Sequence, residues 1–216
     1  MPKSRIKQSK DWKAGFERYS YRALFEKAVE RTAEFGLPKP EIVYTDNAYW
    51  TPASVGGFDA LIREERKELL SGGLAVPTER RVQIAVGLLE PLQDFFSCKA
   101  YVTVGSVSRS KEKWYALSEK NVRRWLSESV YGDELSLHAW LTLDSMEILD
   151  VTFLPTVLDV SERSEFSRRA VAANPDTLPR AQPRLPSFPT HGLKYEPFVI
   201  GLDFLQKLVL PTGWVE

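Results

Sequence analysis

The sequence has few residues able to form a disulfide or to hold a metal. Its 216 residues include one cysteine, Cys98, and two histidines, His138 and His191. A single cysteine excludes an internal disulfide and fits a reducing compartment. One thiol and two widely separated imidazoles give none of the ligand spacings of zinc sites, so we expect no metal. A glycine-rich phosphate loop is also missing, and we expect no cofactor.

The sequence also lacks a long apolar run and a net charge. Without a run of about 18 apolar residues, we expect no membrane span. Lys plus Arg and Asp plus Glu each number 29, which gives no overall attraction to nucleic acid or to anionic lipid. Because no apolar segment follows the basic N-terminus, it is not a secretory signal, and we expect a cytoplasmic protein.

Length and composition favour one folded domain behind a short tail. A chain of 216 residues that is 43% hydrophobic has ample material for one core. We expect residues 1–18 to form a basic tail and residues 19–216 a single domain. A solvated tail is expected there, and a nucleic-acid-binding arm is the weaker alternative.

Hydrophobic periodicity predicts helices first and strands later. Helices are predicted at 21–35, 58–71, 78–90 and about 111–129, and strands at 100–107 and 198–202. This order favours an α+β fold.

Proline and glycine add local predictions. Pro91 should kink or end the third helix, and Gly105 indicates a bulge or a close backbone approach in its strand. Six prolines predict an extended C-terminal wrap or loop at about 174–197. His191 lies in this segment and is expected to be a turn residue.

Residues 137–143 and 148–153 alternate as the two strands of a hairpin. In the first, the odd-numbered residues are apolar, and His138 and Trp140 lie on the opposite face. In the second, Leu149, Val151 and Phe153 form the apolar set and oppose Asp150.

The length of the connecting loop decides where the carboxylate of Asp150 points. A two-residue turn would place Asp150 among leucines, which is unfavourable for a carboxylate. A three-residue loop aligns the odd-numbered apolar residues and places Asp150 opposite His138 or Trp140, within reach of the imidazole. The pattern therefore predicts His138 and Asp150 on one face of the hairpin.

The sequence His-Ala-Trp on one strand and Asp-Val-Thr on the next resembles the core of papain-like and transglutaminase-like cysteine enzymes. It is most similar to the bacterial branch that includes lasso-peptide leader peptidases. The resemblance covers about residues 77–155 and implies an antiparallel sheet with N-terminal helices. In such enzymes a Cys at a helix start attacks a carbonyl, a His is its base and an Asp orients the imidazole. His138 and Asp150 match these last two roles, and Trp140 and Thr152 match neighbouring substrate-side positions.

The nucleophile departs from the family pattern. The helix that should carry it begins Pro77-Thr78-Glu79-Arg80-Arg81, and Cys98 lies beyond that helix. The helix expected at 111–129 is a second departure. A structural thiol is the alternative for Cys98, and a core histidine is the alternative for His138.

Two functions follow from the resemblance. The first is a thiol-dependent amide or peptide hydrolase or acyl transferase, with Cys98, His138 and Asp150 as catalytic residues and Trp140 and Thr152 on the substrate. The second is a catalytically inactive papain-like domain that binds a peptide or protein. Both predict a peptide or protein partner and no role for nucleic acid or membrane.

Overall fold

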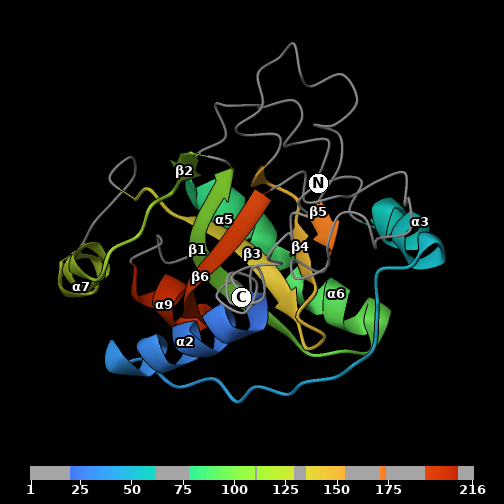
Figure 1. Ribbon diagram of the computed structural model, residues 1–216, viewed down its shortest axis with the longest axis horizontal. Coiled ribbons are helices and arrows are strands. Elements are labelled where there is room, and N and C mark those ends of the chain that lie inside the picture. Colours follow the sequence, from blue (N-terminus) through green and yellow to red (C-terminus); the bar gives the residue numbers. More distant parts are fainter. Residues whose placement is uncertain are drawn as a thin grey trace, which may run out of the picture.

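The computed structural model describes residues 20–61, 78–109, 111–128, 135–153, 171–173 and 193–208. These residues form helices and one antiparallel sheet, so the predicted α+β class is confirmed (Figure 1). The expected tail at 1–18, His191 and most of the proline-rich segment lie outside the described residues. None of the described helices is long and apolar enough to cross a membrane.

The described elements follow one another in a fixed order along the chain. They are α2 (Tyr21–Glu34), α3 (Pro52–Leu61), α5 (Thr78–Gly87), α6 (Leu89–Phe96), β1 (Ala100–Arg109), β2 (Glu112–Trp114), α7 (Glu119–Ser127), β3 (His138–Leu143), β4 (Ile148–Asp150), β5 (Val171–Ala173), β6 (Leu193–Ile200) and α9 (Leu202–Lys207).

Strand β1 is the centre of the sheet. The strand order is β2-β1-β3-β4-β5, with β6 also paired to β1, and every pairing is antiparallel. Strand β6 occupies one edge of β1 along residues 103–109, so β2 and β3 must share the other edge. The end of β2 therefore lies near the start of β3, where His138 is found.

Both faces of the sheet are buried along most of β1 and all of β3. The odd-numbered residues of β3, such as Leu141, pack in one core with α5 and α6. The even-numbered Trp140 packs in a second core against Tyr21 and Phe25 of α2. Helices α2 and α5 thus cover opposite faces (Figure 1). Since all six residues of β3 are buried, the face that carries His138 is interior as well.

The helical predictions hold best where local signals are strong. Helix α2 matches its prediction, with the Ser20 hydroxyl accepting from the backbone N–H of Ala23 at its start. Helix α3 begins at Pro52, earlier than the predicted 58, and residues 62–71 lie outside the described chain. The predicted helix 78–90 is divided into α5 and α6 just before Pro91. In a continuous helix the Pro91 ring would clash with the carbonyl of Gly87, four residues earlier.

The helix predicted at about 111–129 was wrong over its first part. Residues 112–114 instead form β2, with Trp114 opposite Val107 of β1. Helix α7 begins at Glu119, where the Ser118 hydroxyl accepts from the backbone N–H of Asn121. Hairpin pairing with β1 and the Ser118 cap together override the helical spacing of the apolar residues between Trp114 and Leu126.

The boundary of the proline-rich segment was also wrong. Strand β6 begins at Leu193 and contains Pro197, within the predicted loop. Pro197 lies opposite Gly105, and the register of β1 and β6 shifts between Val104 and Gly105. A proline is tolerated in a sheet at such an irregularity, where the ladder is already interrupted. The bulge or close approach predicted for Gly105 is confirmed.

Candidate functional site

The hairpin of β3 and β4 has the predicted three-residue loop. Leu141 pairs with Leu149, and the backbone N–H of Leu143 donates to the carbonyl of Glu147 at 2.8 Å. Met146, the last loop residue, has a positive φ of 65°, as expected when a turn ends in the left-handed region. Continuing this register places Asp150 across from Trp140 and diagonal to His138. The predicted shared face of His138 and Asp150 is confirmed.

The imidazole of His138 and the carboxylate of Asp150 form a buried hydrogen-bonded pair. His138 Nε2 lies 2.8 Å from Asp150 Oδ2, and the two side chains are 1% and 0% exposed. The Tyr195 hydroxyl donates to the same Oδ2 at 2.9 Å. The other oxygen, Oδ1, accepts from the backbone N–H groups of Thr152 and Phe153 at 3.0 and 3.1 Å. Both carboxylate oxygens are therefore fixed by several donors.

Opposing effects act on the pKa of Asp150. Burial by itself raises the pKa, because it disfavours the charged form. The positive charge and hydrogen bond of His138, with the N–H groups of Thr152 and Phe153, outweigh burial and lower the pKa below its ordinary value. The folded protein therefore holds Asp150 as a carboxylate more strongly than the unfolded chain does.

This lowered pKa predicts a loss of stability in acid. A carboxyl with a depressed folded pKa stabilises the fold above its unfolded pKa of about 3.9, and that stability is lost as the pH falls through the folded pKa. We expect the free energy of unfolding to decline from about pH 5 downward in urea titrations. The Asp150→Asn variant, which lacks the titrating group, should show a shallower decline. Equal slopes for the two proteins would contradict the prediction.

Aromatic side chains surround His138. The Tyr115 ring stacks on the imidazole with centroids 5.2 Å apart and planes 22° apart. Phe153 and Trp140 contact it at centroid distances of 5.5 and 5.8 Å. Tyr115 follows β2 and has a positive φ of 55°, which turns the chain over the start of β3. The imidazole is therefore enclosed rather than presented to solvent.

Arg81 connects Tyr115 to the start of α5. Its NH1 group donates to the Tyr115 hydroxyl at 2.7 Å, and its NH2 group donates to Thr78 Oγ1 at 2.7 Å. Thr78 begins α5, so the guanidinium folds back over the first turn of its own helix. Arg81 and Tyr115 thus lie between this helix start and His138. In the sequence, Arg81 stands out only as part of the helix start that departs from the family pattern, and no local signal marks Tyr115.

The structure does not bring Cys98 to His138. Cys98 follows α6, and Ala100, two residues later, pairs with Leu143 at the far end of β3. Five residue steps along the strand separate Leu143 from His138, about 17 Å. Burial, followed by the nearby charge of Asp144, raises the pKa of the Cys98 thiol to about 11. The fold assembles two members of the predicted Cys-His-Asp arrangement, and the third lies at the opposite end of the ladder.

The structure also places Trp140 and Thr152 in the interior, away from any substrate surface. Trp140 is 0% exposed, and its indole N–H donates to the Tyr21 hydroxyl of α2 at 2.8 Å. Thr152 is 1% exposed, and its backbone N–H donates to Asp150. Helix α2 covers Trp140, whereas Thr152 serves to hold the Asp150 carboxylate.

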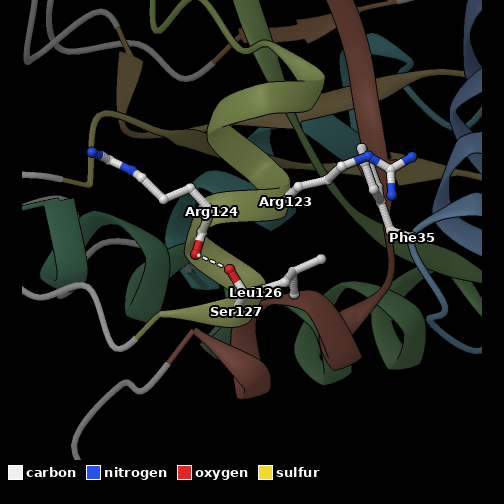
Figure 2. A pocket seen from close by; sticks show the side chains of 5 residues that line it. All are labelled: Phe35, Arg123, Arg124, Leu126 and Ser127. Atoms are coloured by element: carbon white, nitrogen blue, oxygen red, sulfur yellow. Dashed lines mark hydrogen bonds between the residues drawn. The ribbon is translucent and has the colours of Figure 1, made fainter.

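A shallow hollow of about 350 Å³ lies beside α7. Its lining residues are Phe35, Arg123, Arg124, Leu126 and Ser127. The Arg123 guanidinium lies over the Phe35 ring, 5.1 Å from its centroid, and Arg124 extends to the other side of the helix (Figure 2). None of these residues contacts His138, so the hollow is separate from the histidine site.

Within the described ranges, no group of three or more His, Cys, Asp or Glu side chains could hold a metal ion. No family model, curated protein or solved structure matches the chain. The protein is therefore defined by its own geometry, as an α+β fold with an antiparallel sheet and a buried His-Asp pair.

Proposed function

We propose that this chain is a catalytically inactive domain with a papain-like or transglutaminase-like core, and that it acts by binding a peptide or protein partner. One observation carries the proposal. The Tyr115 ring stacks on His138 at 5.2 Å and is hydrogen-bonded to Arg81 of the helix that should supply the nucleophile. A phenol thus covers one face of the imidazole, and a guanidinium from the first turn of that helix holds the phenol by its hydroxyl.

The position of the thiol agrees with this reading. Nucleophile and base must lie within hydrogen-bond reach, about 2.6–3.2 Å, or tighten to it during the reaction. Cys98 lies beyond the far end of the β1–β3 ladder from His138. With a pKa of about 11, its thiol is mostly protonated at neutral pH and is a poor nucleophile.

The His-Asp pair then has a structural role. Asp150 ends β4, His138 begins β3, and Tyr195 belongs to β6, so one carboxylate ties three strands together. Buried polar groups that are fully hydrogen-bonded in this way favour one register over its alternatives. Thiol-dependent acyl chemistry is the competing function, because the same pair could orient a catalytic imidazole.

Alkylation of Cys98 by iodoacetamide distinguishes the two functions. Because only the thiolate reacts, we expect the rate to rise about tenfold per pH unit from pH 7 to 10, below the thiol pKa of about 11. At pH 7 the rate should be far below that of N-acetylcysteine. His138→Ala should leave the rate unchanged, and Cys98→Ser provides the blank. A fast reaction at pH 7 that His138→Ala abolishes would overturn the inactive reading and restore the enzyme.

A further inference from the structure

Arg81 is a buried cation that has no anionic partner among the described residues. The residue is 9% exposed, and both of its hydrogen-bond partners, Tyr115 and Thr78, are neutral hydroxyls. Its Nε is buried and has no hydrogen-bond partner in the described part of the chain. Within the described chain, no carboxylate forms an ion pair with it, including Glu79 on the same helical turn.

A buried guanidinium is usually paired with a carboxylate or phosphate, because an isolated buried charge is unfavourable. A guanidinium has five N–H donors, and two of them are used here, so three are left. The N-terminal turn of α5 adds a positive potential of its own, which makes the lack of a counter-ion more unfavourable. The observations together indicate that an anion completes this position.

The neighbouring hydroxyls match an anion as well. Tyr115 and Thr78 each accept a hydrogen bond from Arg81, which leaves their own hydroxyl protons to be donated. In the part of the chain that the structure describes, neither hydroxyl has another hydrogen-bond partner. Guanidinium and hydroxyl donors therefore belong to one hydrogen-bonded cluster that keeps unused donors within the described residues.

We propose that Arg81, with the hydroxyls of Tyr115 and Thr78, binds a carboxylate presented by the partner, an inference that rests on the proposed binding function. One guanidinium carries a single positive charge, so a monoanion balances it. The planar fork of an arginine also matches the two oxygens of a carboxylate. The carboxylate is either the C-terminus of a peptide or the side chain of an acidic residue.

The Nε–Hε signal of Arg81 in nitrogen-15 NMR spectra tests this directly. Titration with sodium acetate, at an ionic strength held constant with sodium chloride, should shift the signal to saturation. Arg124, exposed on α7, is the matched reference, and its Nε–Hε signal should stay in place. Tyr115→Phe, which removes one donor, should weaken acetate binding up to about tenfold. Arg81→Gln, which has no Nε–Hε signal at this position and is followed through the backbone amide of Tyr115, should abolish acetate binding, while Arg124→Gln should leave it intact.

Three peptides distinguish the two sources of the carboxylate. They are acetyl-trialanine with a free C-terminus, the same peptide amidated, and amidated acetyl-Ala-Glu-Ala. Saturation by the first alone identifies a C-terminal carboxylate, and saturation by the third identifies an acidic side chain.

Three results would overturn the inference. The first is an acetate-induced shift of the Arg81 signal that stays linear and that the Arg124 signal shares. The second is a saturating acetate shift of the Tyr115 amide signal in Arg81→Gln. The third is inorganic phosphate binding at least about tenfold tighter than acetate, which would remove the assignment to a monoanionic carboxylate. Should Arg81→Gln not fold, the wild-type titration and Tyr115→Phe still decide the matter.

The carboxylate site and the proposed function fail separately. Acetate saturation at Arg81 together with His138-dependent alkylation of Cys98 would keep the site and remove the inactive reading. Slow alkylation that does not depend on His138, with no acetate saturation, would support the inactive domain and remove the carboxylate site.

Discussion

The Asp150→Ala variant is expected to lose about 3–5 kcal/mol of unfolding free energy. The substitution leaves His138 and the Tyr195 hydroxyl without their shared acceptor, and the N–H groups of Thr152 and Phe153 lose theirs. All of these groups are buried, so water cannot replace the carboxylate without local opening. Urea unfolding at pH 7, followed by circular dichroism, measures the loss.

The matched control is Asp94→Ala. Asp94 is an exposed residue of α6, and its removal should change the unfolding free energy by less than about 0.5 kcal/mol. The comparison therefore separates the loss of a carboxylate from the loss of these particular contacts. If Asp150→Ala lost less than about 1 kcal/mol, the structural role of the pair would be contradicted. Such a small effect would favour the enzyme, since catalytic groups are often retained at the expense of stability.

The second large effect is expected for Gly105→Ala. A Cβ at Gly105 would lie 2.2 Å from the backbone oxygen of Glu196 and 2.6 Å from a ring carbon of Trp140. The first contact is with the backbone of β6 at the bulge, so neither strand can yield without disturbing the ladder. We expect the unfolding free energy to fall by about 3 kcal/mol or more, the upper end for overpacking a core.

Gly87→Ala is the control for this substitution. Gly87 is the last residue of α5, and a Cβ there meets nothing within 4 Å. Alanine is the better helix former and restricts the unfolded chain, so this variant should gain about 0.4–1 kcal/mol. Opposite signs for the two glycines would support the close approach of β6 to β1. A neutral Gly105→Ala would mean that β6 does not approach β1 as closely as it does in the structure.

The hairpin could be predicted because its information is local. Period-two alternation and the requirement to keep Asp150 away from leucines select a single loop length, and the structure has that loop. Helix α2 could also be predicted from local sequence. Its apolar residues have helical spacing, Ser20 caps its start, and Gly36, with φ of 73°, follows its end.

Other elements could not be predicted because distant segments decide them. Residues 112–114 become a strand only because β1 offers an edge next to the start of β3. Phe153 was placed with Leu149 and Val151, yet β4 ends at Asp150 and the chain turns Phe153 into the core of α2, against His138. Alternation fails as soon as the strand stops, and the sequence contains no signal for that stop.

By itself the sequence determined the α+β class and the shared face of His138 and Asp150, because period and loop length act over a few residues. Only the tertiary structure decided what surrounds the pair. Tyr115 reaches His138 from the segment after β2 and is held by Arg81 of α5, whereas the β1–β3 register carries Cys98 to the opposite end of the strand. Such placements depend on which strands share an edge of β1, and no local pattern encodes that choice.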